Sequence, residues 1–242
     1  MEQKAKKVFF LTARDPATHC IAREARFEIE GLAELCSLLG IPVQDWEARS
    51  TYDLDPADAV ALARHYGITF DPGTMPSEVR PWNAADDLPY TVHTGRELAM
   101  MLAGTKPLAA FVDDDPSLHG AYVIPEREFE PHVASGRIIK REQLVPPSAD
   151  APVVHGQRIG RRRVLYALPG QQWRIDAYLL LYETAEKSGW NEDLERMEGT
   201  LLGYEGWQNE LNIERKFRST QSEESATPAG APATHANSPA KS

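Results

Sequence analysis

Apolar residues recur at helical spacing over 171–188, and no other segment of this sequence predicts its structure so strongly. The apolar side chains of this repeat cover a wide face of the helix: Ile175, Tyr178, Leu179, Tyr182 and Ala185. Such a face has to be buried against several neighbouring elements. A second helical pattern follows at 192–202, and Gly189 separates the two. The C-terminal part of the folded region is therefore expected to be helical.

Short apolar, β-prone runs predict strands elsewhere in the chain, at 8–12, 107–112, 121–124, 137–145 and 164–168. Helical patterns occupy 22–39 and 55–67, and the second has Asp55 as a capping residue and Pro56 in its first turn. Thr94 and Glu97 match a capping box before another helix. Asp113-Asp114-Asp115 is expected to break the strand that precedes it. About five strands and three long helices predict an α+β fold class.

The expected organisation is one globular domain over 8–216, preceded by a flexible N-terminus over 1–7. Residues 146–157 carry prolines and alanines and mark an internal boundary within that domain. Residues 71–89 hold four prolines and are expected to form a long connection, which is either a functional loop or a packed one. Residues 217–242 are rich in Ser, Thr, Ala and Pro, so we expect a disordered tail.

Composition narrows the classes of protein to which the chain can belong. No run approaches the length of about 18 apolar residues that a membrane-spanning helix requires, and the apolar run 8–11 is too short for a secretory signal. We therefore expect a soluble, cytoplasmic protein with no membrane partner. Its formal net charge of −10 disfavours non-specific binding of nucleic acid. The two cysteines, Cys20 and Cys36, are expected to be reduced thiols.

One basic segment stands out against this acidic background. Residues 136–163 hold seven basic residues against two acidic ones, and the candidate ligand-binding side chains among them are Arg158, Arg161, Arg162 and Arg163. Such a patch could bind a phosphate-bearing ligand or an acidic partner. Alternatively, the arginines neutralise acidic groups of the same protein.

His19 and Cys20 are followed by five residues and then by Arg26. This spacing resembles the phosphate loop of the cysteine-dependent phosphatases. The resemblance implies that Cys20 is a nucleophilic thiolate and that Arg26 holds the phosphate oxygens. In the alternative interpretation, Arg26 lies on the solvated side of a helix and Cys20 is half-buried.

The segment Tyr90-x-x-His93-Thr94-Gly95 precedes a predicted helix and a predicted strand, and Tyr122 and Glu142 lie on later strands. This order loosely resembles that of the ADP-ribosyltransferases. The resemblance implies that His93 holds a nicotinamide ribose and that NAD is the bound molecule. In the alternative, Thr94 and Glu97 simply cap a helix.

The remaining signals carry less chemistry. The spacing of the other histidines predicts no metal site, and no cofactor follows from the sequence. The C-terminal aromatic residues form either core or a self-association face: Trp173, Tyr178, Tyr182, Trp190, Tyr204 and Trp207. The first functional hypothesis is a non-catalytic accessory or regulatory protein that binds a partner or a phosphate-bearing ligand. The alternative is an enzyme acting on a phosphate-containing substrate.

Overall fold

A computed structural model describes residues 6–40, 51–118, 124–148 and 151–218, to which all structural statements refer. The chain divides into two compact units, one ending at Ala177 and one beginning at Tyr178. The division falls within helix α5 (Trp173–Ser188). The boundary expected near 146–157 lies inside the first unit, where β7 (Val153–Val154) and β8 (Gln157–Arg158) form a small hairpin.

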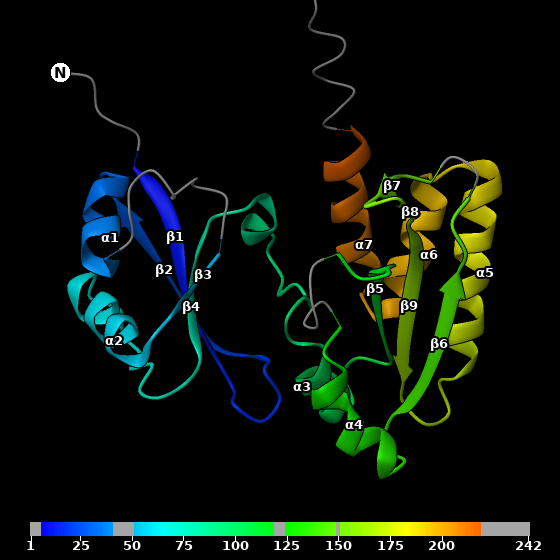
Figure 1. Cartoon of the computed structure of the whole chain (residues 1–242), viewed down its shortest axis with the longest axis horizontal. Coiled ribbons are helices and arrows are strands. Elements are labelled where there is room, and N and C mark those ends of the chain that lie inside the picture. The colour runs from blue at the N-terminus through cyan, green and yellow to red at the C-terminus, as the bar shows by residue number, and fades with distance from the viewer. Residues whose placement is uncertain (1–5, 41–50, 119–123, 149–150, 219–242) are drawn as a thin grey trace, which may run out of the picture. The chain divides into compact units, whose positions relative to one another are not determined.

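A four-stranded antiparallel sheet opens the first unit. Its strands are β1 (Lys7–Arg14), β2 (Ile21–Ile29), β3 (Tyr52–Leu54) and β4 (Ser77–Pro81), in the order β2-β1-β4-β3. Helices α1 (Leu32–Leu39) and α2 (Pro56–His65) lie on one side of this sheet (Figure 1). Their apolar residues pack with alternate strand residues in one core, which includes Phe9, Leu11, Phe27, Ile29, Leu35, Leu62 and Val79.

The helix expected over 22–39 is wrong in its first half. Residues 21–29 form β2, which pairs with β1 along its length, and the helix begins only at Leu32. Phe27 and Ile29 are buried while Glu28 between them is exposed, as a half-buried strand requires. Pairing with β1 therefore overrides the helix-forming tendency of the alanine, arginine and glutamate residues in this stretch.

Residues 71–89 are also more ordered than expected. They contain β4, which lies between β1 and β3, and the short 3-10 helix η2 (Ala84–Asp87). At α2 the expected cap is confirmed, because the Asp55 carboxylate accepts a hydrogen bond from the Asp58 amide at 2.8 Å. The capping box expected at Thr94 and Glu97 does not form, since α3 (Glu97–Leu102) has Arg96 as its N-cap.

A second antiparallel sheet in the first unit has the order β5-β9-β6, with β5 (Leu108–Asp115), β6 (Ile139–Val145) and β9 (Gly160–Ala167). The expectation that Asp113 to Asp115 break the strand is wrong. They continue β5, with Asp113 opposite Arg162 and Asp114 opposite Arg161. Cross-strand pairing of opposite charges makes an extended conformation favourable there.

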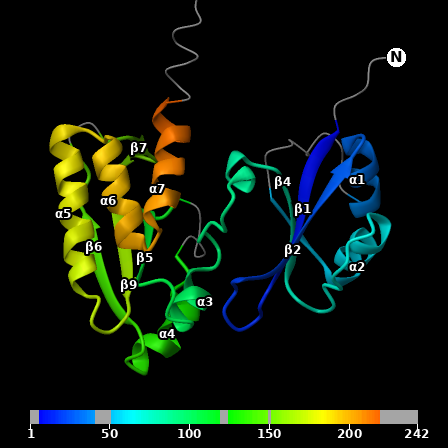
Figure 2. The ribbon, with the colours of Figure 1, turned by 180° about the vertical axis from the view of Figure 1, so that it is seen from behind.

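Helices α3 and α4 (Glu126–Ala134) lie near one end of this second sheet (Figure 2). Leu98, Met101 and Phe129 from these helices pack with Val164 and Tyr166 of β9. The strand expected over 121–124 has residues 121–123 outside the described part of the chain.

The second unit is helical, as the sequence predicts. The end of α5 is followed by α6 (Glu192–Leu202), α7 (Gly206–Ile213) and the π-helical turn η3 (Glu214–Arg218). Helices α6 and α7 approach closely at Gly199, where an added Cβ would lie 2.0 Å from Asn209 Oδ1. The tail expected over 217–242 lies outside the described residues from 219 onward.

The predicted α+β fold class is confirmed: the described residues form three antiparallel sheets and seven α-helices. Among them, no helix is both long enough and apolar enough to cross a membrane. Cys20 and Cys36 are buried free thiols, which confirms that prediction.

Candidate functional site

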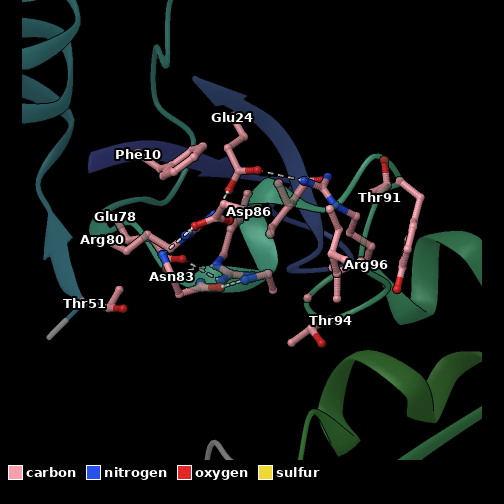
Figure 3. A pocket seen from close by; sticks show the side chains of 17 residues that line it. Phe10, Glu24, Thr51, Glu78, Arg80, Asn83, Asp86, Thr91, Thr94 and Arg96 are labelled. Carbon is pink, nitrogen blue, oxygen red and sulfur yellow. Dashed lines mark hydrogen bonds and ion pairs between the residues drawn. The ribbon is translucent and has the colours of Figure 1, made fainter. Parts of the chain in front are cut away.

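A cavity of about 510 Å³ lies in the first unit, on strands β1, β2 and β4 of the first sheet and on the segment 83–96. Side chains alternate between the two faces of the sheet along each strand, and one of these faces forms part of the cavity wall. Phe10 on β1 is opposite Arg80 on β4, and Thr12 is opposite both Glu24 on β2 and Glu78 on β4. Neighbours on adjacent strands share a face of the sheet, so Phe10, Glu24, Glu78 and Arg80 lie together at the cavity (Figure 3).

Arg80 is the centre of the charged network in this cavity. Its guanidinium donates to both oxygens of Asp86, at 2.8 and 2.9 Å, and to Glu24 Oε1 at 2.8 Å. It also lies 4.3 Å from the centre of the Phe10 ring, a cation–π distance. Asp86 in turn accepts the backbone N–H of Asn83 at 2.8 Å, which fixes η2 against the sheet.

Two further arginines complete the network. Arg96 donates to Glu24 Oε2 and to the carbonyl oxygen of Ile21, both at 3.2 Å. Arg14 forms a two-pronged ion pair with Glu78, at 2.7 and 3.2 Å, and donates to the carbonyl oxygen of His19. Among the described residues of the lining, three arginines and three carboxylates therefore balance each other.

The ion pairs keep these groups charged. Burial alone would raise the pKa of Asp86, but hydrogen bonds from Arg80 and the Asn83 amide outweigh it and lower that pKa. Burial likewise opposes the charge of Arg80, yet hydrogen bonds to Asp86 and Glu24 raise its pKa. The arrangement provides fixed donors and acceptors, and it does not bring Asp86 or Arg80 toward proton transfer near neutral pH.

The two residues of the phosphatase-like spacing occupy different environments. Cys20 is buried, and its Sγ accepts a hydrogen bond from the Ala99 amide at 3.3 Å. Arg26 is exposed on β2 and pairs with Glu28 at 3.3 Å. The residues between Cys20 and Arg26 are extended, whereas the resemblance implies a phosphate loop and the alternative interpretation a helix.

The three residues of the transferase-like order are not assembled by any described contact. His93 is buried, and its Nδ1 lies 3.1 Å from Lys106 Nζ. Glu142 is on β6 and accepts from Arg162 at 2.9 Å. Tyr122 lies outside the described residues. Burial lowers the pKa of Lys106 to about 8, although Glu97 nearby opposes that shift.

The arginines of the basic segment contact groups of the same chain. Arg162 pairs with Glu126 at 2.7 Å and with Glu142, while Lys140 also pairs with Glu126. Arg163 donates to Gln143 Oε1, and Arg158 donates to the carbonyl oxygen of Ala151, both at 3.2 Å. Arg161 is opposite Asp114 in the strand register. These contacts support the charge-balance interpretation of the segment.

Some side chains of the C-terminal aromatic cluster form hydrogen bonds within the second unit, and others are exposed. The hydroxyls of Tyr178 and Tyr182 donate to Glu198, and the Trp190 indole N–H donates to Glu195. Trp173 and Trp207, by contrast, are about half exposed. No group of three or more potential metal ligands occurs among the described residues.

Sequence reasoning did not single out the arginines and carboxylates of the cavity. They come from β1, β2, β4, η2 and the start of α3, so no local spacing connects them. Comparisons with models of protein families, with curated proteins and with solved structures found no match. Arguments about function therefore rest on the geometry of this chain.

Proposed function

We propose that the protein is a non-catalytic accessory protein that binds a small zwitterion, a molecule carrying both a carboxylate and an ammonium group, in the 510 Å³ cavity. The observation that carries this proposal is the balanced, fully paired set of three arginines and three carboxylates on the cavity wall. Preorganised groups of both signs suit a ligand of both signs, because neither end of the ligand then meets an uncompensated like charge.

The same balance makes this cavity less suited to a phosphate dianion. Glu24, Glu78 and Asp86 already accept from the arginines, and a dianion carries no positive group that could compensate these carboxylates as the ammonium group of a zwitterion does. Arg162 in the basic segment is engaged in the same manner. We therefore expect a phosphate-bearing ligand to bind in this cavity more weakly than a zwitterion does, and the screen below includes both.

The test is a thermal-shift and calorimetric screen of the full chain against free amino acids, inorganic phosphate, ATP, NAD and vanadate. A ligand that binds the native state at a hundredfold excess over its Kd stabilises it by about 2.7 kcal/mol. We expect an amino acid to give the largest shift and Arg96→Gln to remove that shift. Arg26→Gln is the matched control, because Arg26 is an exposed arginine on β2 outside the cavity lining.

The competing hypothesis, an enzyme acting on a phosphate-containing substrate, is tested in the same screen. Binding of NAD that His93→Ala abolishes, or binding of vanadate that Cys20→Ser abolishes, would favour it over the proposal. Binding of an amino acid that is unchanged in Arg96→Gln would place the ligand elsewhere and overturn the proposed site.

A further inference from the structure

A second and larger cavity, of about 920 Å³, lies in the same unit. The turn between β1 and β2 forms part of its lining with Thr18, His19 and Cys20, and strand β5 and helix α4 form another part. It shares Arg14, Glu78, Thr94 and Gly95 with the first cavity, so these residues form a common wall. Arg80 and Arg96 line the first cavity and not the second.

The charges around this second cavity are not balanced. Four carboxylates line it, and Arg14, the one arginine in its described lining, is already paired with Glu78 at 2.7 Å. Asp53, Glu97 and Glu128 are the other three. His19 Nε2 lies 3.7 Å from Glu128 Oε1, which is beyond hydrogen-bond length. Positive potential from a ligand would therefore be favourable in this space.

Glu128 is the most deeply placed of these carboxylates, with a side chain only 7% exposed. Arg127, which donates to it at 3.2 Å, is 72% exposed and is not part of the cavity lining. Burial also raises the pKa of Glu97, even though backbone N–H groups and the Lys106 charge act in the opposite direction. The surroundings thus compensate the negative charge of Glu97 incompletely.

The rest of the wall is apolar and aromatic. Leu98, Phe111 and Phe129 line the cavity, and the Phe111 and Phe129 rings meet edge to face with centroids 5.7 Å apart. Val112, also in the lining, is 41% exposed, which is high for a large apolar side chain in a strand. Aromatic faces attract cations as well as apolar groups. This wall suits the hydrocarbon body of a ligand.

We infer that this second cavity binds an organic cation, a primary amine with an apolar or aromatic body. The ammonium group pairs with Glu128, the least exposed carboxylate of the lining, and the body packs on Phe111 and Leu98. This inference goes beyond the proposed function, because it concerns a different cavity with a different balance of charge. A carboxylate-bearing ligand of the same shape would meet the same acidic groups with the wrong sign.

The experiment is a calorimetric titration of the full chain with phenethylamine and, as a probe of similar size and opposite charge, with 3-phenylpropionate. We expect the amine to bind at least tenfold more tightly than the acid. Glu128→Gln is expected to weaken amine binding about tenfold or more. Glu130→Gln, an exposed change on the same helix, is the matched control and should leave the affinity unchanged.

Two further variants keep the inference falsifiable. Glu97→Gln removes a second lining carboxylate, which serves if Glu128→Gln fails to fold. Arg96→Gln changes a side chain that lines the first cavity and not the second, so amine binding should persist in this variant even when amino-acid binding is lost. Equal affinity for the two probes, no amine binding, or loss of amine binding in Arg96→Gln with retention in Glu128→Gln would each overturn the inference.

Discussion

Two arginine networks in the first unit have the same charge pattern, one arginine between two carboxylates, but different surroundings. Arg80 lies between Glu24 and Asp86 at the first cavity, and Arg162 lies between Glu126 and Glu142 on the second sheet. Side-chain exposure is 16% for Arg80 and 27% for Arg162, and the carboxylates differ similarly, at 13–21% against 33–38%. The same charge pattern can therefore form part of a cavity wall or a solvated surface.

The largest expected effect comes from removing the central arginine of each network. Arg80→Met leaves Glu24 and Asp86 in a shielded site, so we expect a loss of about 2–4 kcal/mol in the free energy of unfolding. Arg162→Met should cost about 1 kcal/mol or less, because its partners are better solvated. Urea denaturation of both variants measures the difference. Equal losses in the free energy of unfolding for the two variants would show that the different exposure of the two networks does not affect stability.

Lys106 extends the comparison to a buried lysine, whose Nζ lies 3.1 Å from His93 Nδ1. Burial lowers its pKa to about 8, whereas the paired Arg80 has a raised pKa. Between pH 8 and 10.5, the ordinary pKa of a lysine, the unfolded chain binds this proton more strongly than the folded chain does. Stability should therefore rise with pH over that interval, by up to about 3 kcal/mol from this group.

Urea denaturation at a series of pH values measures that rise. The variant Lys106→Met should not show it, since the titrating group is gone. A rise of the same size in wild type and variant would assign it to another residue.

An intermediate effect is expected from acid at the more exposed network. Hydrogen bonds from Arg162 and Lys140 lower the pKa of Glu126 to about 2, although burial opposes them. A carboxylate with a depressed pKa stabilises the fold above its unfolded pKa, and this contribution is lost as pH falls from about 4.5 toward 2. Wild type and Glu126→Gln should therefore differ by about 1 kcal/mol at pH 7 and converge near pH 2. Stability curves that stay parallel down to that pH would contradict the assignment.

The smallest effect is that of salt. Raising the ionic strength to 1 M shortens the screening length to about 3 Å and should reduce the contribution of Arg162 by a few tenths of a kcal/mol. The contribution of Arg80 should change less, because its partners are shielded. Repeating the two arginine substitutions at low and high salt tests this. A stronger salt effect at Arg80 would reverse the comparison.

Much of the fold could be predicted from the sequence because local signals there agree with the packing. Helix α6 follows its apolar repeat, and Asp55 caps α2. Residues 22–29 could not be assigned correctly from local signals, because pairing with β1 decides their conformation. Asp113 to Asp115 are extended for a similar reason, since arginines of β9 lie opposite two of them.

The candidate site was less predictable than the fold. Glu24 and Arg80 are separated by 56 positions, and Arg14 and Glu78 by 64. These side chains come together only through the register in which β1, β2 and β4 pair. The spacing of residues along the sequence does not predict that register. Cys20 was named for its position before Arg26, but it is buried in a core with Leu98 and Met101, and its Sγ accepts a hydrogen bond from the Ala99 amide.

Strand β2 has a consequence for how copies of the chain behave at high concentration. It is an edge of the first sheet, a position that can recruit another strand and start aggregation. Exposed Arg23, Arg26 and Glu28 lie along this edge. Charged side chains at an edge strand oppose the addition of another strand, because a strand that pairs there would have to desolvate them. In the sequence these charged residues resemble the solvated face of a helix. In the folded chain they oppose the addition of further strands to β2 and so disfavour aggregation into fibres.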